Sequence, residues 1–269
     1  MFRSLVLSAG LFLISAANAS AHEFWIGPED FTLSKEQPLV AHLRVGEAFK
    51  GSSFANIPAQ YERFELRQGA SQVRITSRIG DRPAINQTLP QDGMWVVLHE
   101  TRDSYLTYKD EGQFANFVTH KDLTGVLEAH AARGFEETGF TENYRRYAKS
   151  LVAVGEGAGA DQNYGMLTEI VALTNPYGKG FDGQMQVQVL YDGAPRADVQ
   201  LEVYDRSPDG KVRVFTQRTD QAGRATVAVE KGHSYLFDSV TMLPNEPTQE
   251  NRRSVWTSLW ASLTFAVPE

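Results

Sequence analysis

The stretch Gln184-Met185-Gln186-Val187-Gln188-Val189-Leu190-Tyr191-Asp192-Gly193 carries the clearest structural signal in the chain. Apolar side chains stand at every second position from Met185 to Tyr191, mostly with glutamines between them. Alternation at period two is typical of a β-strand with one buried face. Asp192-Gly193 then has the composition of a two-residue hairpin turn. The stretch therefore predicts a strand that turns back into a β-sheet.

The same pattern continues to the carboxyl terminus. Further alternating runs, separated by glycine-containing turns, occupy residues 199–203, 212–214, 225–229 and 255–267. The last run places Trp256 and Trp260 on the face opposite its aliphatic side chains. About seven strands in roughly 100 residues is the size of an immunoglobulin-like sandwich.

The amino-terminal part of the chain shows similar short strands. Alternating runs occupy residues 37–45, 72–79, 94–99 and 105–108. In the first of them, His42 points away from the more apolar face. Short strands joined by turns favour a β-sandwich over alternating β and α units.

Helical spacing replaces alternation between residues 110 and 149. Apolar residues recur at intervals of three and four from Leu123 to Ala131, and again from Tyr144 to Leu151 after the break at Gly139. Two short helices fit this spacing best. The segment Tyr147 to Val154 also alternates acceptably, so its helix or strand state stays open.

A glycine-rich segment then divides the chain. Gly155-Glu156-Gly157-Ala158-Gly159-Ala160 predicts a linker, because no helix opens directly after it as a dinucleotide-binding turn would require. The predicted fold class is mainly β, with two immunoglobulin-like β-sandwich domains. The first spans 22–160 and contains a helical segment at about 110–149, and the second spans 161–269.

Residues 1–21 have the three parts of a secretory signal peptide, namely a basic Arg3, an apolar run and a final Ala19-Ser20-Ala21. The apolar run is too short to span a bilayer, and no other window is long enough, so a membrane-embedded protein is not expected. The chain has no cysteine, and hence no lipid-attachment cysteine. We therefore predict a protein of the bacterial periplasm, exported through a cleaved signal peptide.

Charge and composition exclude several classes of function. The chain has 26 basic and 33 acidic residues. Arg3 is the only charged residue of the predicted signal peptide, so the mature chain would have a formal net charge of 25 minus 33, or −8. An acidic protein is a poor partner for nucleic acid. Without cysteine, any metal must be held by nitrogen, oxygen or thioether ligands.

The histidines are the candidate metal ligands. Cleavage after Ala21 would leave His22 first, and its α-amine and imidazole can chelate one ion. His99 ends a predicted strand, His120 precedes a predicted helix and His130 lies on that helix. The metal site that we predict consists of His22, His99, His120 and His130, for nickel, cobalt or copper. The alternatives are that His22 is an accident of cleavage and that His130 is a core histidine satisfied by a hydrogen bond.

The sequence also resembles a known family. Five stretches together are similar to the DUF4198 family: Ala21-His22-Glu23-Phe24-Trp25-Ile26, Leu43-Arg44-Val45-Gly46-Glu47, Tyr144 to Leu151, Glu169 to Tyr177 and Trp256 to Phe265. The resemblance implies a periplasmic component associated with nickel and cobalt uptake. A second resemblance, to carboxypeptidase-regulatory or transthyretin-like sandwiches, is carried by Gly193-Ala194-Pro195 and residues 219–225. Such modules usually act as binding modules or as spacers, and they seldom catalyse reactions.

Three hypotheses about function follow. The leading one is a periplasmic transition-metal-binding protein that acts in uptake or delivery, with a membrane transporter or outer-membrane receptor as partner. An enzymatic alternative is a copper-dependent oxidase with an N-terminal histidine brace. The third is a β-sandwich module that binds envelope glycan or protein without metal, using Trp256 and Trp260 as a platform.

Overall fold

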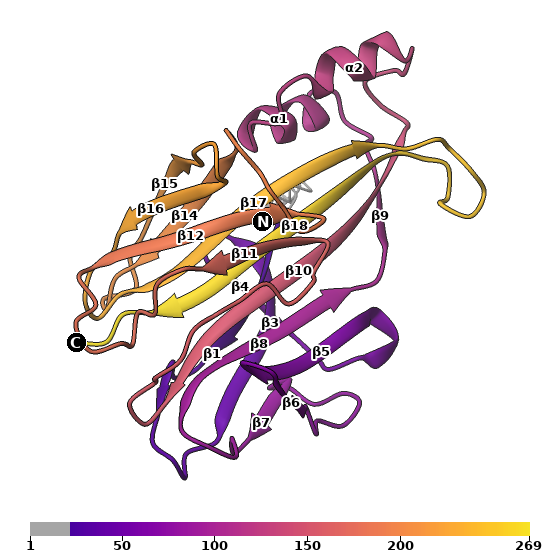
Figure 1. Cartoon of the computed structure of the whole chain (residues 1–269). Helices are drawn as coiled ribbons and strands as arrows, with labels where there is room; N and C mark the ends of the chain where they lie inside the picture. Colours follow the sequence, from indigo (N-terminus) through magenta and orange to yellow (C-terminus); the bar gives the residue numbers. More distant parts are fainter. Residues whose placement is uncertain (1–21) are drawn as a thin grey trace, which may run out of the picture.

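The structure, a computed structural model, describes residues 22–269, so the predicted signal peptide lies outside the described residues. Three β-sheets and two short helices make up the described chain (Figure 1). The prediction of a mainly β protein with a short helical segment is confirmed.

A ten-stranded sheet, here called the long sheet, runs through the whole molecule. Its main path follows the order β15 (Val212–Arg218), β14 (Gln200–Arg206), β17 (Ser234–Pro244), β18 (Ser254–Ala266), β10 (Thr141–Val154), β8 (Gly93–Thr101), β5 (Tyr61–Gln68) and β6 (Ser71–Arg74). The short strands β2 (Thr32–Leu33) and β9 (Ser104–Thr107) pair with β10. β10 and β18 run parallel, so strands from both sides of residue 160 share one sheet.

Two smaller sheets accompany the long sheet. The N-terminal sheet contains β1 (Glu23–Pro28), β3 (Leu39–Glu47), β4 (Lys50–Phe54) and β7 (Ile85–Gln87). The C-terminal sheet contains β11 (Thr168–Ala172), β12 (Gln184–Tyr191), β13 (Ala194–Pro195) and β16 (Arg224–Ala228). A single 3₁₀ turn, η1 (Pro58–Gln60), precedes β5. The strand and turn predicted at 184–193 are thus β12 and its hairpin to β13.

The long sheet forms the middle layer because its central strands are apolar on both faces. In β8, Met94, Val96 and Leu98 belong to a core shared with the C-terminal sheet, whereas Trp95 and Val97 belong to a core shared with the N-terminal sheet. All five side chains are buried. Burial on both faces explains why this run is continuously apolar rather than alternating.

One predicted strand is shorter than expected, since β6 ends at Arg74 and residues 75–79 leave the sheet. The amide of Asn56 donates hydrogen bonds to the carbonyls of Ser77 (3.3 Å) and Arg78 (3.1 Å). These carbonyls are therefore satisfied by a loop side chain instead of a strand ladder.

The helices are α1 (Gln113–His120) and α2 (Val126–Ala132), which pack on one end of β17 and β18 (Figure 1). The helix favoured from Tyr144 to Leu151 is wrong, and the strand alternative left open for Tyr147 to Val154 is confirmed, because this segment belongs to the strand β10. β10 pairs with β18 on one edge and with β8 and β9 on the other, and most of its side chains are buried. A strand buried on both faces loses its period of two and can match helical spacing. None of the described helices is long and apolar enough to cross a membrane.

Strand β1 is fixed on the long sheet by two hydroxyl groups. Ser262 donates to the carbonyl of Phe24 (2.8 Å), and Thr264 donates to the carbonyl of Ile26 (2.7 Å). Both hydroxyls are buried. The small polar residues of β18 therefore anchor the N-terminal sheet to the long sheet through β1.

Candidate functional site

Side chains of β1, β14 and β17 meet between the N-terminal sheet and the long sheet. Successive positions along the three strands lie at the same levels. In the ladder of β14 and β17, Glu202 lies opposite Asp238, Tyr204 opposite Leu236 and Arg206 opposite Ser234. β1 contributes Glu23, Trp25 and Gly27 to the same three levels. Every second side chain of a strand points to the same side, so these three levels face the region between the two sheets. The first level forms an acidic end, the second is apolar, and the third, which contains Arg206, forms a basic end.

The acidic end is organised around Lys121, a buried residue directly after α1. Its Nζ lies 3.1 Å from Glu23 Oε1 and 3.1 Å from Asp238 Oδ2, and it also donates to Glu202 Oε2. The ammonium lies 5.0 Å from the centre of the Trp260 ring. One cation is therefore shared by three carboxylates that come from three different strands.

These contacts set the protonation of the groups. Burial would lower the pKa of Lys121, but the charges of Asp238, Glu23 and Glu202 raise it well above its usual value. Burial raises the pKa of Asp238 to about 7 against the opposing effect of Lys121. For Glu202, burial is outweighed by the hydrogen bond with His120 and by Lys121, so its pKa falls to about 2. Lys121 is thus a permanent cation and not a nucleophile.

A pocket of about 650 Å³ opens beside this cluster, and we call it the acidic pocket. Its charged lining consists of Glu23, Glu47, Asp110, Glu111, Glu202, Lys121 and the titratable His120. Five carboxylates against one ammonium give a formal lining charge of −4 when His120 is neutral. Apolar walls come from Leu106, Phe117 and Tyr108. The volume lies within the range of about 300–1,000 Å³ that is usual for small-molecule sites.

His120, one of the predicted metal ligands, lies on the wall of the acidic pocket. Its Nε2 is 2.9 Å from Glu202 Oε1, and this hydrogen bond raises the pKa of His120. Nδ1 makes no hydrogen bond with any of residues 22–269, and 61% of the side-chain surface is exposed. A carboxylate therefore orients the ring while one nitrogen stays accessible.

His99, the second predicted ligand, lies elsewhere, in a box of aromatic rings. The centres of the Phe24, Tyr61 and Phe64 rings lie 5.1, 5.1 and 4.9 Å from that of His99. The side chain is buried, and neither ring nitrogen has a hydrogen-bond partner among the described residues. Burial lowers its pKa to about 3.

We expect His99→Phe to remove a pH dependence of stability. The folded pKa of about 3 is below the ordinary value of 6.5, so the unfolded chain binds the extra proton between these values. The stabilising contribution of neutral His99 is present above pH 6.5 and is lost as pH falls, by up to about 1.4 kcal/mol per pH unit. Chemical denaturation across this range should show the wild type losing more stability than the variant. Parallel curves would contradict the assignment.

His130 has both ring nitrogens engaged. Nε2 lies 2.9 Å from the Glu136 carbonyl, and Nδ1 accepts a hydrogen bond from the Trp256 indole at 2.9 Å. The ring is buried among Phe114 and Phe140. These contacts match the alternative of a satisfied core histidine.

His22 is the first described residue and precedes Glu23, which lines the acidic pocket. Its carbonyl accepts a hydrogen bond from Arg146 Nη2 at 3.2 Å. The structure thus places His22 and His120 near the acidic pocket and puts His99 and His130 in separate aromatic surroundings. Over residues 22–269, no three His, Asp or Glu side chains are positioned to hold one metal ion together.

The proposed tryptophan platform is wrong. Trp256 and Trp260 do share one face of β18, but they are only 2% and 4% exposed. Trp260 stacks on Phe117 and Trp256 packs against Phe114, so both rings lie under the helices. They are unavailable for stacking on a sugar, which removes the main support for a glycan-binding module.

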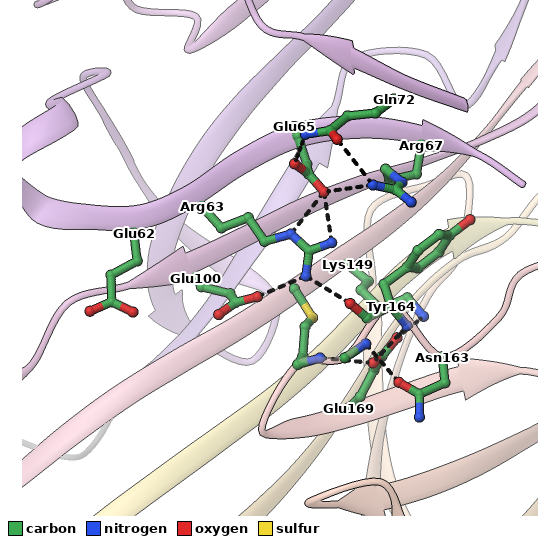
Figure 2. Close-up of polar contacts among 12 residues, drawn as sticks. Glu62, Arg63, Glu65, Arg67, Gln72, Glu100, Lys149, Asn163, Tyr164 and Glu169 are labelled. Carbon is green, nitrogen blue, oxygen red and sulfur yellow. Dashed lines mark hydrogen bonds and ion pairs between the residues drawn. The ribbon is translucent and has the colours of Figure 1, made fainter. Parts of the chain in front are cut away.

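A second buried ion cluster surrounds Lys149 of β10 (Figure 2). Its Nζ lies 2.7 Å from Asp161 Oδ2 and 2.8 Å from Glu169 Oε1. Glu169 also accepts hydrogen bonds from the backbone of Tyr164, whose carbonyl accepts one from Arg63 at 2.9 Å (Figure 2). The cluster does not line the acidic pocket, and it fixes the loop before β11 to the long sheet.

Four residues at the acidic end are not among those predicted from the sequence: Glu23, Lys121, Glu202 and Asp238. A signal was present, since Glu202 and Asp238 stand inside apolar strands, in Leu201-Glu202-Val203 and Phe237-Asp238-Ser239. A charged residue in a strand with buried neighbours needs a partner. The pattern could not show that the partner would be Lys121, which lies 81 and 117 positions away.

The fold and the pocket define a mainly β protein with an acidic, small-molecule-sized cavity between the two sheets and the segment 106–121, which includes α1. The family described as "Domain of unknown function (DUF4198)" matches residues 19–242, and the chain belongs to this family. The comparison with curated proteins found no match. A solved structure titled "Crystal structure of tetra-tandem repeat in extending region of large adhesion protein" is 8% identical, with a TM-score of 0.20. The match covers 91% of this chain and 49% of that chain.

Proposed function

We propose that this protein binds a small, positively charged ligand in the acidic pocket. We further propose that the ligand is a divalent transition-metal ion that brings small-molecule ligands of its own. The observation that carries the proposal is the pocket lining, in which five carboxylates face one lysine. Lys121 already neutralises part of the cluster at the base, so Glu47, Asp110 and Glu111 supply most of the remaining negative charge.

His120 supports a transition metal over a purely organic cation. Histidines that bind metal usually donate their second ring N–H to a carboxylate, which orients the ring. His120 has this arrangement, with Nε2 on Glu202 and Nδ1 accessible. Imidazole nitrogen suits nickel, copper, zinc and related ions. A cavity of about 650 Å³ is far larger than an ion requires, and it has room for ligands that accompany the metal.

Several finer predictions belong to the same proposal. The signal-like N-terminus supports export to the periplasm. The family resemblance supports a role in nickel or cobalt uptake, with a transporter or receptor as partner. The division into two immunoglobulin-like sandwiches, the second transthyretin-like, is supported by strand periodicity and by the C-terminal sheet packed on the long sheet.

A calorimetric titration tests the proposed ligand. Nickel chloride, nickel with excess L-histidine and 1,4-diaminobutane are the probes. We expect the nickel complex to bind, and we expect His120→Ala to weaken binding about tenfold or more, because one nitrogen ligand is lost. His42→Ala is the matched control, since His42 lies outside the pocket and contacts Ser53 and Glu29.

Each other outcome contradicts part of the proposal. Binding of the diamine alone would contradict the metal and leave an organic cation as the ligand. Unchanged nickel binding in His120→Ala would contradict the site. If no probe binds, the acidic pocket is not a cation site.

A second candidate function, a metal site at His22, is favoured by the fixed position of that residue. Arg146 holds its carbonyl, and β1 is anchored from Glu23 onward. If the mature chain begins at His22, its amine and imidazole would stand at a defined place beside the pocket. Copper titration of protein with a mass-verified His22 start, beside protein with one added N-terminal alanine, separates the two sites. Loss of binding only in the extended protein would favour His22, and reductant-dependent substrate oxidation would favour the copper oxidase.

A further inference from the structure

A second cavity lies at the basic end of the space that β1 and β14 share. It has a volume of about 230 Å³, and we call it the basic pocket. Its lining includes Trp25, Gly27, Arg44, Lys50, Gly51 and Arg206. No carboxylate lines it. This is unusual in a chain whose formal net charge is −7.

Within residues 22–269, the two arginines of the basic pocket have no counter-ion. Neither Arg44 nor Arg206 makes an ion pair with any carboxylate of residues 22–269. Burial, together with the nearby charge of Arg44, lowers the pKa of Arg206. Two like charges held together in a half-buried cavity are unfavourable unless an anion compensates them.

Both guanidinium groups are held in place and keep free donors. Arg206 Nε donates to Ser234 Oγ at 3.0 Å, and its guanidinium carbon lies 4.3 Å from the centre of the Phe49 ring. Arg44 Nη1 donates to the Gly51 carbonyl at 3.2 Å. These contacts use one nitrogen of each group. The remaining N–H donors can bind an oxyanion with two parallel hydrogen bonds.

Trp25 adds a neutral donor, and Gly27 leaves room beside it for a ligand. The Trp25 side chain lines the pocket, and its indole N–H donates to no residue within the described chain. A Cβ at Gly27 would lie 3.1 Å from the Arg44 side chain and 3.4 Å from the indole nitrogen. A larger residue at Gly27 would therefore crowd both donors. Gly51 is required for a different reason, because a Cβ there would clash with the Val45 carbonyl oxygen of the neighbouring strand.

An apolar layer separates the basic pocket from the acidic pocket. Trp25, Phe49, Tyr204 and Leu236 form a small buried cluster between the two. The two cavities therefore lie at opposite ends of the same three strands and have opposite charge. Their ligands need not be the same.

We propose that the basic pocket is a binding site for a small oxyanion, held by Arg44, Arg206, Lys50 and the Trp25 indole. The volume is below the usual range for drug-sized ligands, which favours a phosphate-like or small carboxylate ion. This site is independent of the proposed cation site.

Calorimetry with inorganic phosphate and with malonate, each against sodium chloride of equal ionic strength, tests the proposal. We expect at least one of them to bind, and we expect Arg206→Gln and Arg44→Gln each to weaken it about tenfold or more, since a charge-assisted hydrogen-bond pair is lost. Arg224→Gln is the matched control, because Arg224 is exposed and lines neither pocket. Circular dichroism confirms that each variant is folded.

The results also separate the two proposed sites. Phosphate binding alone or malonate binding alone identifies the ligand chemistry. His120→Ala should bind the anion as the wild type does, whatever the fate of the cation site. The proposal is overturned if neither ion binds, or if Arg206→Gln and Arg44→Gln bind as tightly as Arg224→Gln.

Discussion

Lys121→Met is expected to lower the free energy of unfolding at neutral pH by about 3–5 kcal/mol, because it leaves buried carboxylates without their cation. Glu23, Glu202 and Asp238 are all at most 4% exposed and share the single ammonium. A globular domain has roughly 5–15 kcal/mol of stability, so this loss is a large fraction of the total. Urea unfolding of the variant and wild type measures it.

The loss should depend on pH in a defined direction. Without Lys121, mutual repulsion and burial raise the pKa of the carboxylates, so the folded variant takes up protons that the unfolded chain releases. Groups whose folded pKa is raised contribute their stability below the unfolded pKa and lose it as pH rises. The defect should therefore be smaller at about pH 5 than at about pH 8. An equal defect at both values would mean that packing, not charge, is responsible.

Two further variants serve as controls for Lys121. Lys179→Met removes an exposed pair with Glu156, in which the side chains are 83% and 75% exposed. Its effect should stay within about 0.5 kcal/mol, as is usual for surface pairs. Adding Glu202→Gln to Lys121→Met should restore part of the lost stability, because one of the unpaired charges is removed.

Lys149→Met is expected to have an effect of similar size, about 3–5 kcal/mol, for the same reason. Asp161 and Glu169 have fully buried side chains around this ammonium, and burial already raises the pKa of Asp161. The local consequence should differ from that of Lys121. These carboxylates accept backbone hydrogen bonds from Tyr164 and Ala172, so the loop before β11 should loosen.

Hydrogen exchange followed by mass spectrometry locates this effect. Peptides that cover residues 161–172 should exchange faster in Lys149→Met than in Lys121→Met at matched global stability. Lys211→Met, which removes an exposed pair with Asp209, should leave exchange in this segment unchanged. Protection that falls equally throughout the variant would contradict a local role.

The acidic and basic pockets could be predicted only in part. The polar position of Glu202 in Leu201-Glu202-Val203 is visible in the sequence, as is the position of His42 on the less apolar face of β3. Neither pattern shows which distant element supplies a partner. Lys121 directly follows α1, yet its ammonium donates hydrogen bonds to carboxylates of three strands. This is possible because α1 packs against the end of the long sheet.

The amino-acid sequence by itself determined the β class, the hairpin at 184–193, the helical spacing at Leu123–Ala131 and the absence of thiol chemistry. These features depend on local periodicity and composition, which act over a few residues. The tertiary structure alone decided that 141–154 is a strand and that β10 joins β18. It also decided that Trp256 and Trp260 are buried and that charges of opposite sign collect at opposite ends of one space. These outcomes depend on which surfaces meet, and pairing between distant strands leaves no periodic trace in the chain.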